Sequence, residues 1–438
     1  MVIATAVALA APGDTSFKRC VDDTSGAESC GRTGDSLNGA NGVAISPNGR
    51  DAYVPAIFDD SIAHLRLNQR KGKLRPIDGN CIDDNEGADT CPRQATALDG
   101  VGSAVVSPDG RFVYTTSSDR AIAIFKRNKV SGRLRPAGCI EDDAGGLSEC
   151  GRSGPGLLGV HTVLISPDGR AAYAASSTDD AIAILKRSRK TGKLRSLGCV
   201  EDGPRSLSPD SSGCSKAAGG LDSASDLEFG PGARSLYYAG SSSDTVGRMK
   251  VKGNRRLAPR ECVADVDTGT GGCAIEMQGL DGPSDLELAT KGVRRLYVGA
   301  GGGFEHSIAI LRPKGRTGKL RPKECLADED SGPPSGCSRE ADGLEPISGI
   351  ALAPDERNLY ARASVDDSLV TLKRNRRTGL LIDRGCIADD DAPAPGSDCA
   401  READTLNGGG PIAIAPNGRW LFTVSQIEDA VSVFKLAR

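Results

Sequence analysis

The sequence has few aromatic residues, few histidines and no large excess of charge. Of its 438 residues, one is Trp, seven are Tyr, eight are Phe and three are His. Sugar-binding surfaces usually stack their ligands on several aromatic rings, so this composition argues against a polysaccharide-active protein. The net charge of −3 gives no reason to expect nucleic acid as a partner, because phosphate binding needs a clear basic excess.

Long apolar runs are also missing. The longest, Val2 to Ala11, is shorter than the roughly 20 residues of a membrane-spanning helix. It ends in a small-x-small pattern, Ala8-Leu9-Ala10, that is typical of the end of a secretory signal, although no basic residue precedes it. We expect residues 1–14 to be an apolar leader, either a signal-peptide remnant or a disordered or edge-strand segment. Residues 15–438 are predicted to form one domain.

Cysteine is abundant by comparison. The 14 cysteines form seven adjacent pairs, and none is left over. Zinc sites would need closer spacing and more histidines, because here the members of a pair lie 10 to 15 residues apart. The pattern predicts seven short-range disulfides and therefore a secreted or otherwise extracytoplasmic protein. The predicted pairs are Cys20 with Cys30, Cys81 with Cys91, Cys139 with Cys150, Cys199 with Cys214, Cys262 with Cys273, Cys325 with Cys337 and Cys386 with Cys399.

The cysteine pairs mark an internal repeat of about 60 residues. Each repeat contains an apolar strand, a turn of the Ser-Pro-Asp-Gly-Arg type, a second strand, an acidic turn, a third strand and a fourth segment that leads into the first cysteine. Four antiparallel strands in about 60 residues are typical of a propeller blade with one enlarged loop. The predicted third strands contain Ile62, Ile122, Ile182, Val246, Ile308, Leu369 and Val431.

The two ends of the chain complement each other. The seventh repeat stops after its third strand, and the chain begins with an orphan fourth strand, Thr15 to Arg19. Pairing these ends would close a ring and remove the free edges of an open array. The sequence therefore predicts an all-β fold, a seven-bladed β-propeller of four-stranded antiparallel blades in which the N-terminal strand completes the last blade.

These turns and strands resemble those of the lactonase-type (YVTN-like) seven-bladed propellers, which include 6-phosphogluconolactonase-like and muconate-cycloisomerase-like enzymes. The similarity covers about residues 15–438 and includes third strands such as Ala121 to Phe125. It implies that His161, just before an innermost strand, lies in an active-site channel. Where the resemblance implies an Arg-His pair in the next blade, this chain has Ser225 and Asp226, and its disulfide loops are an addition to the family pattern.

Polar residues at the start of the innermost strands should surround the central channel. Four carboxylates stand out because the other repeats mostly have small or apolar residues at their positions, and strand alternation puts each pair on one side: Asp226 with Glu228, and Asp285 with Glu287. Such a cluster should raise the pKa values of its members or bind a divalent cation such as calcium. Alternatively, the four carboxylates accept hydrogen bonds from backbone amides around a wet channel.

In the catalytic interpretation, His161 is a general base or metal ligand, and Glu228 and Glu287 orient it or activate water. No cofactor is required. The remaining candidate ligand-binding residues are Asn41, Ser225, Asp226, Ser284, Asp285 and Ser348.

Charged loops should divide between the two faces of the ring. One face receives the aspartates of the disulfide loops and of the turns between second and third strands, such as Asp23, Asp142, Asp180 and Asp367. The other face receives basic residues, including Arg127, Arg187, Arg255 and Arg374. The acidic face could meet a protein partner, or its aspartates could simply bond nearby backbone amides.

Two functions remain open from the sequence. One is a non-catalytic binding or surface-interaction scaffold, and the other is a lactonase-like hydrolase or isomerase acting on a small lactone in the channel. Either way, we expect a monomer that contacts a small-molecule ligand or, through the acidic face, a protein surface.

Overall fold

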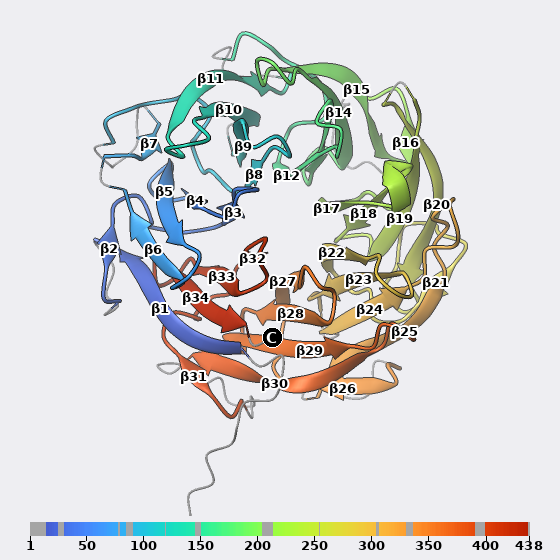
Figure 1. Cartoon of the computed structure of the whole chain (residues 1–438). Coiled ribbons are helices and arrows are strands. Elements are labelled where there is room, and N and C mark those ends of the chain that lie inside the picture. Colours follow the sequence, from blue (N-terminus) through green and yellow to red (C-terminus); the bar gives the residue numbers. More distant parts are fainter. Residues whose placement is uncertain are drawn as a thin grey trace, which may run out of the picture.

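The computed structural model describes residues 15–24, 30–77, 79–84, 91–118, 120–144, 150–203, 213–253, 255–303, 306–329, 336–389 and 399–436. Seven β-sheets stand around a common axis, as Figure 1 shows. This arrangement confirms the predicted seven-bladed β-propeller. The apolar leader, residues 1–14, lies outside the described residues.

In every blade the four main strands run from the innermost first strand outward, and neighbours among these four pair antiparallel. Blade 1 contains β3 (Ala44–Ile45), β4 (Asp51–Ala56), β5 (Ser61–Asn68) and β6 (Lys73–Pro76) with β7 (Ile82–Asp83). Blade 2 contains β8 (Ala104–Val106), β9 (Phe112–Ser117), β10 (Ala121–Arg127) and β11 (Leu134–Glu141). Blade 3 contains β12 (Val160–Ile165), β13 (Ala171–Ser176), β14 (Ala181–Arg187) and β15 (Leu194–Asp202). Blade 4 contains β17 (Ala224–Phe229), β18 (Ser235–Gly240), β19 (Thr245–Val251) and β20 (Leu257–Asp265). Blade 5 contains β22 (Pro283–Ala289), β23 (Arg295–Ala300), β24 (Ser307–Leu311) and β25 (Pro322–Asp328). Blade 6 contains β27 (Ile347–Leu352), β28 (Asn358–Ala363), β29 (Ser368–Arg374) and β30 (Leu381–Asp389).

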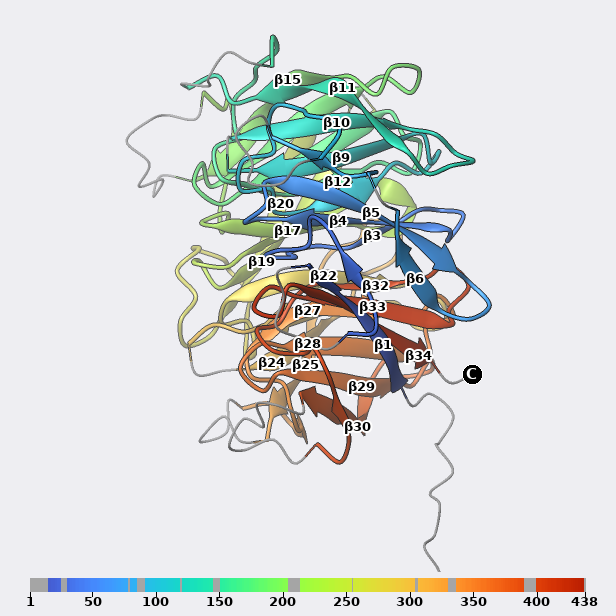
Figure 2. The same cartoon turned by 90° about the vertical axis from the view of Figure 1, so that its left-hand side faces the viewer.

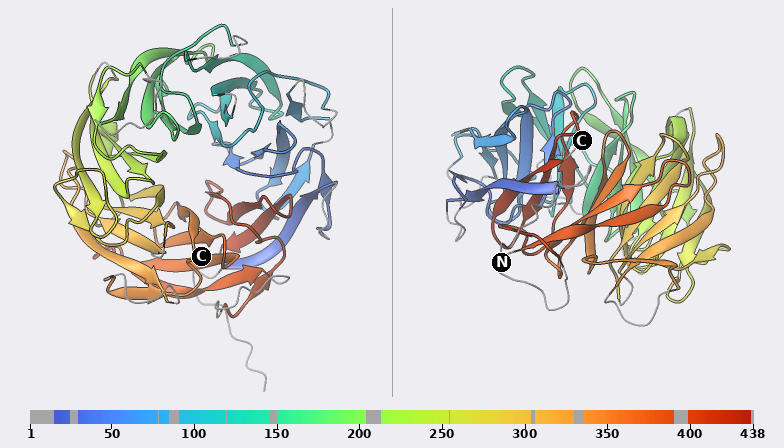
Figure 3. Two further views of the ribbon diagram at one scale, coloured as in Figure 1. Left: turned by 180° about the vertical axis from the view of Figure 1, so that it is seen from behind. Right: turned by 60° about the horizontal axis from the view of Figure 1, so that its bottom comes forward.

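Blade 7 combines both ends of the chain. It contains β32 (Ile412–Ile414), β33 (Trp420–Ser425), β34 (Ala430–Leu436) and the N-terminal β1 (Thr15–Asp23). β1 pairs antiparallel with β34, with Val21 opposite Val431, and Figure 3 shows the blue N-terminal strand beside the red C-terminal ones. The predicted ring closure is therefore confirmed.

All seven predicted disulfides form, with paired Cα atoms 4.8–5.4 Å apart. In each pair the first cysteine lies on or just before the strand that carries the chain out of the blade, and the second brings the returning loop back beside it. The bonds are Cys20 with Cys30, Cys81 with Cys91, Cys139 with Cys150, Cys199 with Cys214, Cys262 with Cys273, Cys325 with Cys337 and Cys386 with Cys399. The prediction made from cysteine spacing is confirmed for every pair.

Five blades also carry a short fifth strand that the repeat did not reveal. Each of these strands follows the second cysteine of a pair and runs parallel to the fourth strand: β2 (Thr33–Gly34), β16 (Ala217–Ala218), β21 (Glu276–Met277), β26 (Arg339–Ala341) and β31 (Glu402–Ala403). The disulfide holds the returning chain beside the blade edge, which lets the fifth strand pair.

The hydrophobic core lies between the blades. A buried tyrosine from the second strand of each of five blades donates its hydroxyl to a backbone carbonyl in the hairpin between the third and fourth strands of the next blade. The pairs are Tyr53 with Gly132, Tyr114 with Gly192, Tyr173 with Arg255, Tyr237 with Gly318 and Tyr297 with Gly379, at 2.6–2.9 Å. These bonds fix each blade to its neighbour.

The two faces of the ring differ in their loops. We call the side with the disulfide loops the disulfide face, and the side with the hairpins between third and fourth strands the hairpin face. Figure 2 shows the β5–β6 and β10–β11 hairpins projecting on its right-hand side. No helix among the described residues is long and apolar enough to cross a membrane.

Three arginines differ from their expected place on a solvated basic face. Arg127, Arg187 and Arg374 are at most 4% exposed, and each donates from Nε to the tyrosine hydroxyl of the preceding blade, at 2.5–2.7 Å. A buried guanidinium needs several acceptors. Backbone carbonyls of the adjoining turns supply the rest, for example that of Gly110 for Arg127, 2.9 Å away. Their role is to join blades.

Candidate functional site

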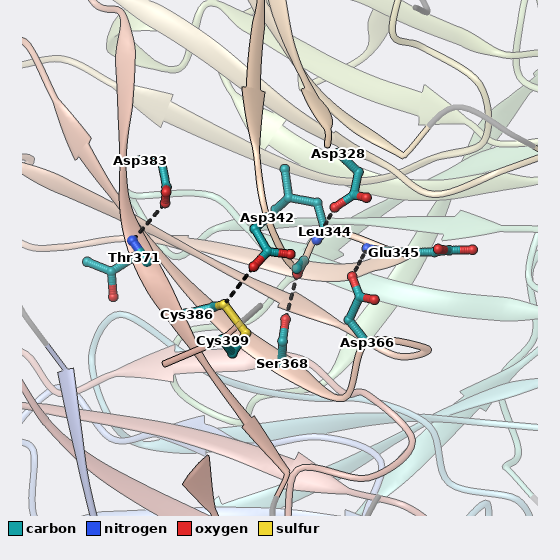
Figure 4. Close-up of a disulfide and its surroundings, with 12 residues drawn as sticks. Asp328, Asp342, Leu344, Glu345, Asp366, Ser368, Thr371, Asp383, Cys386 and Cys399 are labelled. Atoms are coloured by element: carbon teal, nitrogen blue, oxygen red, sulfur yellow. Dashed lines mark hydrogen bonds between the residues drawn. A yellow bond between two sulfur atoms is a disulfide. The ribbon is translucent and has the colours of Figure 1, made fainter. Parts of the chain in front are cut away.

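The aspartates of the disulfide loops are bound to the backbone. In every blade the third residue after the first cysteine is an aspartate that accepts a hydrogen bond from the backbone N–H of a buried leucine further along. The pairs are Asp23 with Leu37, Asp84 with Leu98, Asp142 with Leu157, Asp202 with Leu221, Asp265 with Leu280, Asp328 with Leu344 and Asp389 with Leu406. Figure 4 shows the Asp328–Leu344 example. The bonds anchor the leucine, and with it the core between blades.

The turn aspartates make a second set of such bonds. Each reaches from the turn between the second and third strands of one blade to a backbone N–H in the next blade: Asp60 to Gly100, Asp180 to Ser223, Asp244 to Gly282, Asp367 to Gly408 and Asp429 to Gly39. Burial raises the pKa of Asp180 to about 6 despite that hydrogen bond. The geometry therefore supports the backbone-bonding interpretation of these acidic residues.

One group of potential metal ligands occurs on this face among the described residues. It consists of Asp342 with Cys386 and Cys399. The two sulfurs form a disulfide (Figure 4), and the carboxylate lies 3.8 Å from one of them. Metal ions bind thiolates, so this group offers a metal only its carboxylate.

A cavity occupies the disulfide-face end of the central channel. We call it the channel cavity. Its volume is about 560 Å³, and six predicted site residues line it together with His161: Asn41, Ser225, Asp226, Ser284, Asp285 and Ser348. The structure thus brings seven of the nine candidate residues to one place. The size is that of an ordinary small-molecule site.

A ring of hydrogen bonds joins the innermost strands around this cavity. Ser225 donates to the carbonyl of Pro283 (2.8 Å), Ser284 to that of Ile347 (3.1 Å) and Ser348 to that of Gly410 (3.5 Å). His161 holds the corresponding position in blade 3. These serines therefore have a structural role whatever the cavity binds.

His161 combines a structural bond with a free edge. Its Nδ1 lies 3.1 Å from the carbonyl oxygen of Ser225, and its side chain is exposed to the cavity. A carbonyl can only accept, so Nδ1 carries the proton and Nε2 of the neutral ring presents a lone pair. His161 can accept a proton or a hydrogen bond from a ligand.

Asp226 and Asp285 form a coupled acid pair. Both carboxyl groups accept from the same backbone N–H, that of Leu286, at 3.0 and 2.8 Å. Asp285 also accepts from the N–H of Ile350 in the next blade (2.7 Å). The pair crosslinks the innermost strands of blades 4, 5 and 6.

Burial raises the pKa of both carboxyl groups in the pair. Burial, reinforced by the charge of Asp285, raises the pKa of Asp226 well above its ordinary value. Burial raises the pKa of Asp285 only to about 6, because backbone hydrogen bonds and a bond from Asp226 oppose the effect. Two carboxyl groups this close cannot both ionise readily. Protonation of one member therefore favours the pair, and the larger upward shift is that of Asp226.

Glu228 and Glu287 do not line the channel cavity. Each lies two residues further along its strand, which is about 6–7 Å toward the hairpin face. Burial raises the pKa of Glu228 to about 8, and burial together with neighbouring carboxylates raises that of Glu287 well above its ordinary value. Their predicted catalytic roles stay predictions, because neither carboxyl group shares the cavity with His161.

The four channel carboxylates do not form a compact set of ligand atoms for a cation. Among the described residues, the only three or more ligand atoms within 4.8 Å of one another are those of the Asp342 group. The four channel carboxylates are not such a set. Calcium binding by Asp226, Glu228, Asp285 and Glu287 stays an untested prediction, and the backbone bonds of Asp226 and Asp285 favour the alternative role as amide acceptors.

The cavity also contains residues that sequence analysis missed. Blade 2 contributes Gly102, Ser103 and Thr116, and blade 7 contributes Gln426. Ser103 and Gln426 follow no pattern along the repeat. Gly102 could have been found, because it stands at the position that holds His161 and Ser225 in blades 3 and 4.

Comparison with solved structures gives the fold. The chain is similar to a candidate 6-phosphogluconolactonase of Bacteroides fragilis (18% identity, 79% of this chain and 83% of that one, TM-score 0.55). It is also similar to the periplasmic gluconolactonase of Pseudomonas aeruginosa (18%, 82% and 86%, TM-score 0.55) and to the hydrazine synthase of Kuenenia stuttgartiensis (14%, 92% and 97%, TM-score 0.54). Such different activities on one architecture mean that the fold does not determine the chemistry.

Sequence comparison adds little. No family model matches the chain. An uncharacterized protein of Lactococcus lactis is 26% identical over 101 residues, which is 23% of this chain, and the match spans only 27% of that protein's length. The fold is therefore shared with lactonase-type propellers, while the activity has to be argued from the site.

Proposed function

We propose that this protein is an exported, disulfide-stabilised propeller that binds a small, uncharged, hydroxyl-rich molecule in the channel cavity. The carrying observation is the composition of that cavity. It presents the imidazole of His161, the buried Asp226–Asp285 acid pair, and several hydroxyl and amide groups. None of the described residues that line it is a lysine or an arginine.

The absence of lysine and arginine from the described lining residues determines which class of ligand the cavity can bind. A phosphorylated or carboxylated ligand would meet two aspartates and no lysine or arginine among the described lining residues, and an anion without a counter-charge is costly to desolvate. A neutral polyol or lactone instead meets both donors and acceptors. The side-chain amides of Asn41 and Gln426 can donate, while His161 Nε2 and Asp285 can accept.

Export rests on the seven disulfides. Such bonds persist in oxidising compartments and are rare where thiols are kept reduced. Each closes a loop worth about 3 kcal/mol in the chain-entropy account, and the blades rely on them to hold the returning chain. Recovery of the native protein from the oxidising compartment of its host, with all cysteines paired, tests this part of the proposal.

Calorimetric titration tests the ligand class. We expect D-glucose or D-glucono-1,5-lactone to bind and D-glucose 6-phosphate to bind at least 10-fold more weakly. Gly102→Phe should abolish binding, because a Cβ at Gly102 comes no closer than 3.5 Å to its nearest neighbour, Thr116 Oγ1, so the ring can enter the cavity. An unchanged unfolding temperature shows that the variant folds. Preferential binding of the phosphate ester would overturn the proposal.

A lactonase activity is the second candidate, and the free Nε2 of His161 favours it. A neutral imidazole in a cavity of this size can remove a proton from a water molecule that attacks a lactone carbonyl. His161→Ser is the matched variant, because serine fills the same position in blades 4, 5 and 6 and can keep the bond to the next blade. If hydrolysis of glucono-1,5-lactone occurs, it should fall at least 100-fold in this variant. Equal hydrolysis would exclude His161 as the base.

A further inference from the structure

Large side chains fill several junctions between blades on the hairpin face. At three junctions an arginine at the end of the third strand packs against the tyrosine of the preceding blade; these are Arg127, Arg187 and Arg374. The first residue of the second strand adds to the filling. The Phe112 ring, for instance, lies where a Cβ on Gly192 would approach within 2.3 Å, and Trp420 stands equally close to Gly72.

The junction between blades 3 and 4 has neither of these fillings. Val251 stands at the end of β19, where Arg187 ends β14, and Ala171 begins β13, where Phe112 begins β9. The hairpin of blade 4 is also one residue shorter, residues 252–256 against 188–193. These changes leave a cavity of about 650 Å³, which we call the junction cavity. It is separate from the channel cavity and opens on the other face.

The walls of the junction cavity are largely apolar. Tyr173 and Phe229 form one side, with ring centroids 5.8 Å apart in an edge-to-face arrangement. Val251 and Leu288 contribute aliphatic surface. In blade 4 the usual Ser-Pro-Asp-Gly-Arg turn is replaced by Gly230-Pro231-Gly232-Ala233, so this rim also lacks the aspartate of that turn. An apolar body of ring size fits between these side chains.

Arg255 supplies a cation with spare hydrogen-bonding capacity. It has a positive φ of 67° at the hairpin position where five sister blades have glycine, and its carbonyl accepts from Tyr173, 2.9 Å away. Its guanidinium makes one long ion pair, 4.0 Å to Asp168. Its Nε is buried and has no partner among the described residues. A guanidinium with N–H groups to spare can donate hydrogen bonds to both oxygens of a carboxylate.

Glu228 gives the cavity a second donor. It lines the cavity, and burial raises its pKa to about 8, which favours the protonated, hydrogen-bond-donating form. Asp168 is already engaged, since it accepts from the Ser166 hydroxyl (2.6 Å) and the Arg170 backbone (3.0 Å). Lys252 also lines the cavity. Its ammonium group and the Arg255 guanidinium, opposite one carboxylate that is bonded within its own turn, suit a ligand that carries a single negative charge.

We propose that the junction cavity is a second binding site, for a small organic monocarboxylic acid with an aromatic or aliphatic body. The body lies against Tyr173 and Phe229, and the carboxylate pairs with Arg255. This site is independent of the one proposed in the channel. It takes an apolar anion, whereas the channel cavity takes an uncharged polar molecule.

Ligand-observed NMR with benzoate and phenylacetate as probes, and benzyl alcohol as the uncharged control, tests the site. We expect the two acids to bind the full protein and benzyl alcohol to bind at least 10-fold more weakly. Arg255→Gly restores the glycine of the sister hairpins and should weaken benzoate binding at least 10-fold. Ala171→Phe and Val251→Arg restore the sister-blade fillings and should abolish it.

The channel variant separates this proposal from the first one. Gly102→Phe should leave benzoate binding unchanged, and Ala171→Phe should leave sugar binding unchanged. Thermal unfolding of each variant shows that it folds. Benzoate binding that survives Ala171→Phe and Val251→Arg, or an absence of binding by the unaltered protein at millimolar benzoate, would overturn the proposal.

Discussion

Single carboxylates hold the disulfide loops in place. The clearest test is in blade 4, where buried Asp265 accepts from Leu280, while Asp267 in the same loop is exposed. Asp265→Ala leaves the buried Leu280 amide without its acceptor, so we expect a loss of about 1–3 kcal/mol in the free energy of unfolding. Asp267→Ala should change it by less than about 0.5 kcal/mol. Chemical denaturation measures both, and equal effects would contradict the assigned role of Asp265.

Individual residues were also the hardest to place from sequence. The alternation of β17 put Asp226 and Glu228 on one side of the strand, and both positions were recognised as unusual. The structure has a bulge between Ala224 and Leu227, so the adjacent Ser225 and Asp226 both line the cavity. A local register shift of this kind leaves no signal in a hydrophobic pattern.

At the scale of elements, the hairpins between third and fourth strands join the blades. Gly192 in the β14–β15 hairpin has φ 76°, and a Cβ there would lie 2.3 Å from Phe112. Gly198 in β15 has φ 96°, and a Cβ there would have nothing within 4 Å. We expect Gly198→Ala to cost about 1–2 kcal/mol from backbone strain alone and Gly192→Ala to cost more. Thermal unfolding measures the loss of stability in both variants. Equal losses in Gly192→Ala and Gly198→Ala would show that the contact between the hairpin and Phe112 is loose.

Sequence patterns did predict the elements themselves. Cysteine spacing and the recurring turn located every third strand, and the orphan segment Thr15 to Arg19 identified the closing strand. The burial of Arg127 between two blades was not predicted. Arg127 and the exposed Lys126 are adjacent and are both basic, so the sequence does not distinguish them. Their environments differ because the last side chain of the strand, Arg127, reaches the preceding blade, whereas Lys126 faces the solvent.

At the scale of the whole molecule, buried carboxyl groups make stability depend on pH. Burial raises the pKa of Asp179 and Asp180 to about 6 and that of Asp366 to about 7. Their unfolded values lie near 4, so their contribution to stability is complete below about pH 4 and declines as the pH rises through 6 to 7. We expect a lower unfolding temperature at pH 8 than at pH 5.

The matched variant for this prediction is Asp366→Asn. Its amide oxygen can still accept from the Glu345 backbone, as the carboxylate does at 2.6 Å, but it no longer titrates. The difference in unfolding temperature between pH 5 and pH 8 should shrink in this variant. An unfolding temperature that instead rises from pH 5 to pH 8 in the unaltered protein would show that other groups dominate.

The channel cavity is the feature on which the account of function depends. A crystal structure of the protein soaked with D-glucono-1,5-lactone tests it most directly, since it shows both where the molecule binds and what it contacts. We predict ligand density in the channel cavity, within hydrogen-bond distance of His161 Nε2 and of the Asp226–Asp285 pair. A channel that holds only water at a saturating concentration of the lactone would contradict the proposed function.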